Sequence, residues 1–190
     1  MNAKLSATGS AYFITPETEK PSTHVLAVVV DNVPGVLARV IGLFSGRGYN
    51  IESLTVSETS HEKHLSRITI VSSGTAHVLE QIKKQLERMV PVHRVVDLTL
   101  DAEARGDEKP LERELVLVKV AGKGENRVEA MRLADAFGAR VADASTEHFV
   151  FEMTGRIPRI EQFIKIMEPL GLVEVCRTGV AAMNRGRDGM

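Results

Sequence analysis

The sequence predicts an α+β protein built from two tandem modules, each with the element order β-α-β-β-α-β. Apolar, β-branched runs of strand length alternate with segments whose apolar residues recur every three or four positions. The pattern of residues 23–100 returns in outline over residues 112–180, after a polar stretch. This element order is the split βαβ, or ferredoxin-like, arrangement: a four-stranded antiparallel sheet with two helices on one face.

The first strand, turn and helix form the most informative stretch. Val25–Val30 is an unbroken apolar run, which predicts a strand buried on both faces, and a turn with Asn32, Pro34 and Gly35 follows. Unpaired N–H groups and a partial positive charge mark the first turn of a helix, so a carboxylate is predicted to dock there. An ordinary strand-to-helix turn, which needs Gly and Asn for backbone reasons alone, is the alternative. The helix is predicted from the spacing of Val36, Leu37, Val40, Ile41 and Phe44, which we expect to form one core-facing stripe.

The rest of the first module follows from turn residues and periodicity. Gly46–Gly48 ends the helix, and the half-polar run Ile51–Ser57 predicts an edge strand. Thr75 is a predicted N-cap of the second helix, whose apolar face comprises Val78, Leu79, Ile82, Leu86 and Met89. The other expected elements are a polar loop at Thr59–His64, a strand at Leu65–Val71, a helix stop at Pro91 and a strand at Val92–Leu100.

The second module is separated from the first by Asp101–Leu111, whose polar composition is typical of a linker. The expected domains are a flexible extension at 1–22, a first module at 23–100, a linker at 101–111, a second module at 112–180 and a tail at 181–190. Within the second module we expect strands at Glu114–Ala121, Ala139–Ala144, His148–Thr154 and Leu172–Arg177, and helices at Asn126–Phe137 and Ile157–Met167.

Composition limits the possible partners. The formal net charge is −1, aromatic residues make up 4% of the chain and Trp is absent, so neither nucleic acid nor a membrane surface is an expected partner. The single cysteine, Cys176, excludes an intrachain disulfide and indicates a reducing compartment. No run resembles a signal peptide or reaches the roughly 20 apolar residues of a membrane span. We therefore expect a soluble, cytoplasmic protein.

No motif predicts catalysis or a metal site. His61-x-x-His64 lies in a polar loop without clustered ligands, so a solvated loop is favoured over a metal pair. Cys176 lies in an apolar strand and is predicted to be buried rather than nucleophilic. Gly122–Arg127 lacks the Gly-Lys-Ser/Thr ending of a phosphate loop. An arginine cluster, which is either a solvated tail or a contact to an acidic partner, comprises Arg177, Arg185 and Arg187.

The turn and the helix after it carry a family resemblance. Asp31–Leu37, directly after a buried strand, resembles the ligand turn of an ACT domain, a module that binds small amino acids and controls enzymes. Arg39–Val56 resembles a narrower family, the small regulatory subunit of acetolactate synthase, also called acetohydroxyacid synthase. The likeness continues through Leu65–Ile70, Val78–Leu86, Arg113–Leu115 and Val173–Gly179.

The resemblance implies a non-catalytic subunit that binds and activates a large thiamine-diphosphate enzyme and confers feedback inhibition by valine. It further implies a homodimer through the ACT domains, with the inhibitor lying between the N-terminal modules of two chains. Thiamine diphosphate, Mg and FAD are expected on the catalytic partner and no cofactor on this chain. The motif positions carried over as effector-binding residues are Asn32, Gly35, Val36, Leu37, Asn50 and Ile51.

This sequence departs from the family pattern at two places. Ala38 stands where members often have a serine, and the chain begins with an unusually long polar extension. Two other function classes compete with the regulatory subunit. A free-standing ACT-domain amino-acid sensor, acting on another enzyme or on gene expression, is disfavoured by the lack of a helix-turn-helix segment and of net positive charge. A stand-alone enzyme is disfavoured by the lack of an acid-base pair or nucleophile motif.

Overall fold

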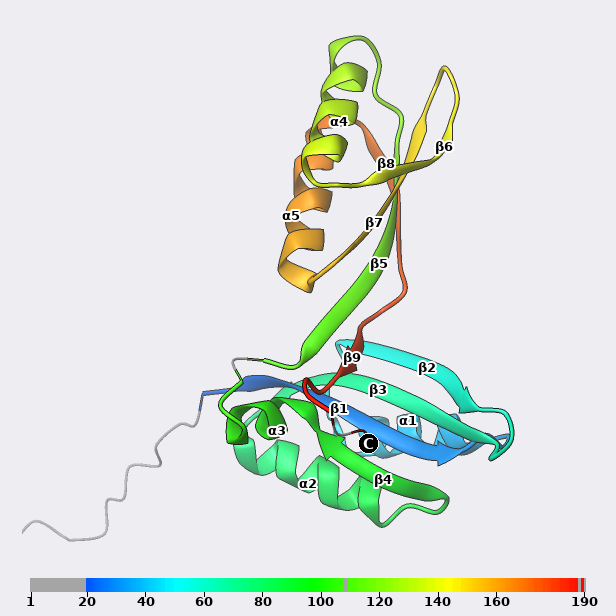
Figure 1. The fold of residues 1–190 in the computed structure, drawn as a ribbon, viewed down its shortest axis with the longest axis vertical. Helices are drawn as coiled ribbons and strands as arrows, with labels where there is room; N and C mark the ends of the chain where they lie inside the picture. Colours follow the sequence, from blue (N-terminus) through cyan, green and yellow to red (C-terminus); the bar gives the residue numbers. More distant parts are fainter. Residues whose placement is uncertain (1–19, 108, 188, 190) are drawn as a thin grey trace, which may run out of the picture.

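The computed structural model describes residues 20–107, 109–187 and 189, which form two sheet-and-helix modules placed end to end (Figure 1). The N-terminal module contains β1 (Ser22–Asp31), α1 (Val36–Arg47), β2 (Ser53–Ser60), β3 (Leu65–Gly74), α2 (Ala76–Glu87), β4 (Val92–Asp97) and α3 (Leu98–Ala104). The C-terminal module contains β5 (Leu111–Val120), α4 (Glu125–Ala136), β6 (Arg140–Ala144), β7 (Phe149–Gly155), α5 (Ile157–Met167), the 3-10 turn η1 (Glu168–Leu170), β8 (Leu172–Arg177) and β9 (Ala181–Met183). The predicted fold class is confirmed. Of the predicted N-terminal extension, residues 1–19 lie outside the described residues, and Ser22 already belongs to β1.

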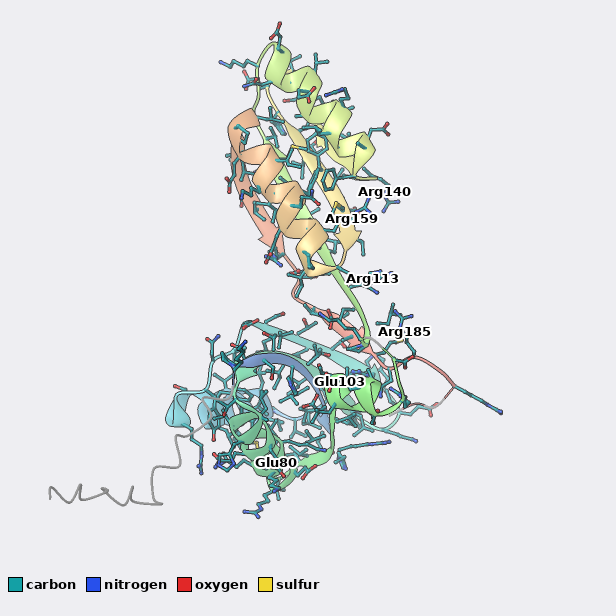
Figure 2. The ribbon with its side chains drawn as sticks, turned by 90° about the vertical axis from the view of Figure 1, so that its left-hand side faces the viewer. Glu80, Glu103, Arg113, Arg140, Arg159 and Arg185 are labelled. Atoms are coloured by element: carbon teal, nitrogen blue, oxygen red, sulfur yellow. The ribbon has the colours of Figure 1, made fainter. Side chains whose placement is uncertain are left out.

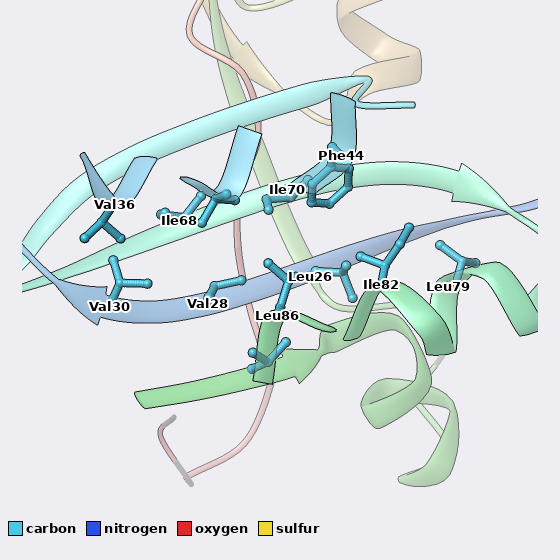
Figure 3. Close-up of a cluster of buried hydrophobic side chains, with 12 residues drawn as sticks. Leu26, Val28, Val30, Val36, Phe44, Ile68, Ile70, Leu79, Ile82 and Leu86 are labelled. Carbon is cyan, nitrogen blue, oxygen red and sulfur yellow. The ribbon is translucent and has the colours of Figure 1, made fainter. Parts of the chain in front are cut away.

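The N-terminal sheet is antiparallel with the strand order β2-β3-β1-β4, so β1 is central and β2 is an edge strand, as predicted. Alternate side chains of β1 and β3 pack against α1 and α2 on one face. Figure 3 shows this core, which includes Leu26, Val28, Val36, Phe44, Ile68, Ile70, Leu79, Ile82 and Leu86. Burying each such side chain contributes about 1.5–3 kcal/mol.

The predicted helix signals of this module are confirmed. Gly48 ends α1 in the left-handed conformation, with φ of 68°, and its N–H donates to the carbonyls of Phe44 and Ser45. At the start of α2 the Thr75 hydroxyl accepts a hydrogen bond from the Val78 N–H. These caps satisfy helix-end groups that would otherwise lack intrahelical partners.

The C-terminal sheet repeats the arrangement with the strand order β6-β7-β5-β8 and with α4 and α5 on one face (Figure 1). Its core joins alternate residues of β5 and β7 to the two helices, and it includes Val116, Val118, Phe151, Met153, Ile160, Phe163 and Met167. The predicted bounds of α5 are those observed.

The predicted strand Val92–Leu100 and linker Asp101–Leu111 are wrong in part, because residues Leu98–Ala104 form helix α3. The Asp97 carboxylate ends β4 and caps this helix, accepting hydrogen bonds from Thr99 N (3.0 Å) and Leu100 N (3.1 Å). Its other oxygen lies 2.7 Å from the ring of His24, which is also buried. The Leu-Thr-Leu sequence favours a strand, but the buried N-cap at Asp97 stabilises a helix there instead.

The predicted tail at residues 181–190 is corrected as well. Strand β9 pairs with Leu111–Arg113 of β5 and lies on the face of the N-terminal sheet opposite α1 and α2 (Figure 1). Val180 and Ala182 are buried there with Val25, Ala27 and Leu98. The two modules are thus joined by a second contact besides the chain connection.

Cys176 was predicted to be buried, but it is exposed. It pairs with Leu117 across the β5–β8 ladder, and paired residues share a sheet face. Their face is the one opposite the helix-side residues Val116 and Val118, so α4 and α5 leave it uncovered.

Gly179 lies where the modules meet, and its replacement by Ala is expected to destabilise the protein. Its φ is +81°, and an added Cβ would lie 2.8 Å from Thr55 Oγ1 and 2.9 Å from Ser53 Oγ on β2. Gly106→Ala is the matched control, because φ there is +78° and nothing lies within 4 Å of the added Cβ. In urea unfolding, we expect Gly179→Ala to lower the free energy of unfolding by about 1–3 kcal/mol more than Gly106→Ala. Equal effects would contradict the close contact.

Candidate functional site

The start of α1 is an open, uncapped helix N-terminus. Gly35 is the N-cap residue with φ of 86° and ψ of −10°; it makes no side-chain cap, and the first helical turn contains no acidic residue. Nothing lies within 4 Å of the position that a Cβ on Gly35 would occupy. The N–H groups at this end, together with the helix dipole, therefore present positive charge to an approachable surface.

Neighbouring loops hold the backbone of this turn. Asp31 N donates to Pro91 O at 3.2 Å, and Asn32 N donates to His64 O at 2.6 Å. The Arg39 guanidinium, one turn into α1, donates to the Val90 carbonyl at 2.8 Å. Since the main chain of the turn is held on both sides, the exposed side chain of Asn32 is available to contact a ligand.

Asn50 and Ile51 lie at the other end of α1. The Asn50 carbonyl accepts a hydrogen bond from the buried Ser72 hydroxyl at 2.6 Å, and Ile51 packs against the N-terminal core. Helix α1 has 12 residues and is therefore about 18 Å long. Within one chain, the structure brings together the four predicted residues Asn32, Gly35, Val36 and Leu37 but separates them from Asn50 and Ile51.

The outer surface of α1 is more apolar than expected. Val36, Val40 and Phe44 are buried, but Leu37 and Ile41, predicted to share their core-facing stripe, are 38% and 40% exposed. The helix carries apolar residues over a wider arc than one sheet can cover. With Val33, which is 47% exposed, they form an exposed apolar strip beside the helix start. Such a strip is typical of a contact with another chain.

The described part of the chain offers no metal centre, because no group of three or more His, Cys, Asp or Glu side chains is placed to hold an ion. His61 instead lies 3.0 Å from Glu58 at the end of β2. Among the described residues, no helix is long and apolar enough to cross a membrane.

A cavity of about 410 Å³ lies between the modules, beside the start of β2. Arg177, predicted to belong either to a solvated tail or to a contact with an acidic partner, forms a two-pronged ion pair with buried Glu114 of the same chain, with N–O distances of 2.9 and 2.6 Å. These hydrogen bonds raise the pKa of Arg177 above its ordinary value. Glu114 also accepts from Gly179 N, and Val180 N donates to Ser53 Oγ at 3.0 Å. Sequence inspection missed this junction, because no short-range pattern links residues so far apart in the chain.

Comparison with family models matches both modules. Residues 26–94 match the "AHAS small subunit-like ACT domain", and residues 113–186 match the "small subunit of acetolactate synthase" model. The chain is 44% identical over 163 residues to the probable acetolactate synthase small subunit of Archaeoglobus fulgidus, covering 86% of this chain and 97% of the relative. The chain belongs to the acetolactate synthase small-subunit family. The small subunit of Mycobacterium leprae is similar, with 42% identity over 88% of this chain and 95% of its own length.

A solved structure extends the family match to three dimensions. The crystal structure of the Thermotoga maritima acetolactate synthase small subunit superposes with a TM-score of 0.77 at 35% identity, covering 88% of this chain and 99% of that chain. The N-terminal module of this small-subunit family member is therefore an ACT domain, and its turn at residues 31–37 lies within the matched region.

The buried carboxylate of Glu114 is expected to stabilise the junction of this small subunit. Glu114→Gln preserves side-chain shape but leaves the partly buried Arg177 without its carboxylate, so the free energy of unfolding should fall by about 2 kcal/mol. Glu161→Gln is the control, since Glu161 is 62% exposed and 3.9 Å from the same guanidinium, and it should change stability by less than about 0.5 kcal/mol. Urea unfolding measures both, and equal losses would contradict the assigned role.

Proposed function

We propose that this small subunit is a non-catalytic regulator that binds the catalytic subunit of acetolactate synthase, activates it and confers feedback inhibition by valine. The observation that carries the proposal is the open helix start at Gly35 within the matched ACT domain. Thiamine diphosphate, Mg and FAD then belong to the catalytic partner, where the reaction takes place.

In this proposal the valine carboxylate accepts hydrogen bonds from the N–H groups of Gly35 and Leu37 at the start of α1. The N–H of Val36, a residue that is 2% exposed, already donates to Val33 O at 3.5 Å. The side-chain oxygen of Asn32 or Asn50 accepts from the valine ammonium. The Val36 side chain is only 2% exposed and faces the core, so the isopropyl group packs instead on Leu37 and Ile51. The free energy of valine binding comes from charge-assisted hydrogen bonds and from burial of the short apolar side chain of valine.

Topology supports a site shared by two chains. Strands β1 and β2 both pair antiparallel with β3, so they run in the same direction, and α1 runs back between them. The helix therefore starts near the end of β2 and finishes near its beginning. If two β2 edge strands pair antiparallel about a two-fold axis, Asn50 and Ile51 of the partner subunit come to the end of the sheet where α1 starts. Residues that lie about 18 Å apart within one chain would then come close together across the interface between two chains.

The same pairing accounts for the exposed surfaces. It satisfies the free backbone edge of β2, which is otherwise open to further strand pairing. It also gives the apolar strip of Val33, Leu37 and Ile41 a surface to pack against. We therefore propose the homodimer through the ACT domains that the family resemblance implies.

A route from the proposed effector site to the C-terminal module follows from β2. Ile51 is two residues from Ser53, whose hydroxyl accepts from Val180 N at 3.0 Å. A ligand that shifts Ile51 therefore acts on a strand hydrogen-bonded to the C-terminal segment. Allostery requires the ligand to favour one arrangement of the protein over another, and in this proposal the arrangements differ in the Ser53–Val180 hydrogen bond.

The proposed role is tested by measuring acetolactate formation by the cognate catalytic subunit, with and without this protein, over a valine titration. We expect a higher rate with the small subunit and inhibition by valine only in the complex. Activation without inhibition by valine would support the catalytic subunit as the partner but would contradict valine as the effector. No activation and no binding would overturn the regulatory role.

The proposed carboxylate site is tested by two substitutions at Gly35. Both Gly35→Asp and Gly35→Asn place a side chain at φ of 86° in open space, so each should cost a similar backbone energy of about 1 kcal/mol. Only Asp adds a negative charge against the ligand carboxylate, so valine inhibition should weaken by at least about tenfold more for Asp than for Asn. The measurement is the valine concentration for half-inhibition, at matched activation by the small subunit. If both variants were equally sensitive to valine, the proposal that the valine carboxylate binds beside Gly35 would be wrong.

A further inference from the structure

A second cavity, of about 350 Å³, lies on the opposite face of the N-terminal sheet from α1. One wall is formed by β2 and β3, and the other by the start of β5 and by β9. Thr55 pairs with Thr69 and Ser57 pairs with Arg67, so these side chains share one sheet face. That face is the one away from the helices, since Ile68 and Ile70 fill the helix-side core.

Two arginines, Arg67 on β3 and Arg113 on β5, are among the residues that line this cavity, and none of the lining residues is acidic. Arg67 donates to the Ala182 carbonyl at 2.6 Å, and Arg113 donates to the Glu112 carbonyl at 2.7 Å. Figure 2 shows Arg113 at the junction of the two modules. Neither arginine forms an ion pair within residues 20–107 and 109–187, so most of their N–H donors remain available to an anion.

The environment of Arg67 contrasts with that of Arg177 at the neighbouring cavity. Arg177 has a carboxylate partner in Glu114. Burial without a carboxylate lowers the pKa of Arg67, which shows that the surroundings disfavour its charged form. An anion in the cavity would supply the missing counter-charge and two-pronged hydrogen bonds.

The other residues that line the cavity indicate which kind of anion would fit. Thr55 contributes a hydroxyl-bearing side chain from β2 to the wall of this cavity. Ser57, Thr59 and Thr69 add further hydroxyl groups. Leu111, Ala182 and Met183 give the opposite wall an apolar surface. The cavity is therefore amphipathic and suits a molecule with a charged head and a short hydrocarbon body.

We propose that this cavity binds a small organic anion, a carboxylate or a phosphate ester with a short aliphatic body, whose charged group contacts Arg67 and Arg113. Because Arg67 belongs to the N-terminal module and Arg113 to β5, one bound anion contacts both sides of the junction. This site lies across the sheet from Gly35 and does not depend on the proposed valine site.

The test uses the full chain labelled with ¹³C at the methionine methyl groups. Met183 lines the cavity and is assigned with a Met183→Leu variant. The probes are isovalerate, inorganic phosphate and the uncharged 3-methylbutan-1-ol. A saturable shift of the Met183 methyl signal is expected with an anion and not with the alcohol. Tighter binding of isovalerate or of phosphate distinguishes a carboxylate head from a phosphate head.

Four variants test whether the anion binds at the two arginines. Arg67→Gln and the exposed Arg113→Gln should each weaken anion binding by at least about tenfold, whereas Arg94→Gln should not. Arg94 is the matched control because it pairs with Val29 on the same sheet face as Arg67 but lines a different cavity. Gly35→Asp should also leave the Met183 response unchanged, which separates this site from the proposed valine site. No saturable shift with either anion, an equal response to the alcohol, or unchanged binding in both arginine variants would overturn the proposal.

Discussion

The burial of β1 on both faces is the constraint on which the rest of this structure depends. Leu26 and Ala27 are adjacent and point to opposite faces of the sheet, yet both are fully buried. Helices α1 and α2 cover one face, as in any split βαβ module. The other face is covered by α3 and by the chain that returns after β8, where Val180 and Ala182 are buried. The C-terminal end of the protein is therefore part of the N-terminal core, and without it the second face of β1 would lose part of its cover.

This shared covering gives the proposed regulatory role a physical route between the two modules. The segment that covers β1 passes over β2 at Gly179, where the backbone approaches so closely that a Cβ would clash with the Ser53 hydroxyl. Strand β2 in turn begins at Ser53, two residues after Ile51, which with Asn50 is one of the positions proposed for valine. A ligand at the edge of one module is thus separated from the other module by a few hydrogen bonds rather than by a flexible linker.

Charge pairing divides the junction into two chemically different cavities. In one, Arg177 is neutralised by the buried carboxylate of Glu114, which makes this contact structural. In the other, Arg67 and Arg113 face hydroxyl groups and apolar side chains without a carboxylate among the lining residues. The Glu114–Arg177 pair lies within the C-terminal module and fixes the segment whose Val180 N–H donates to Ser53 of β2. Arg67 and Arg113 come from different modules, so an anion bound between them would add a contact to the Arg67–Ala182 hydrogen bond already present. Both cavities are inferred from the packing of this chain and not from the family match.

The sequence by itself determined the local elements, because strand and helix signals act over a few residues. The turn from Asn32 to Gly35, the N-cap at Thr75 and the bounds of Ile157–Met167 were all predicted from spacing and capping residues. It also identified the helix start as the candidate anion site. Only the tertiary structure decided that Leu98–Ala104 is a helix, that Ala181–Met183 is a strand and that Cys176 is exposed. It also decided that α1 separates Gly35 from Asn50 within one chain, which is the reason for proposing a site shared by two chains. These features depend on which distant surfaces meet, and short-range periodicity carries no information about that choice.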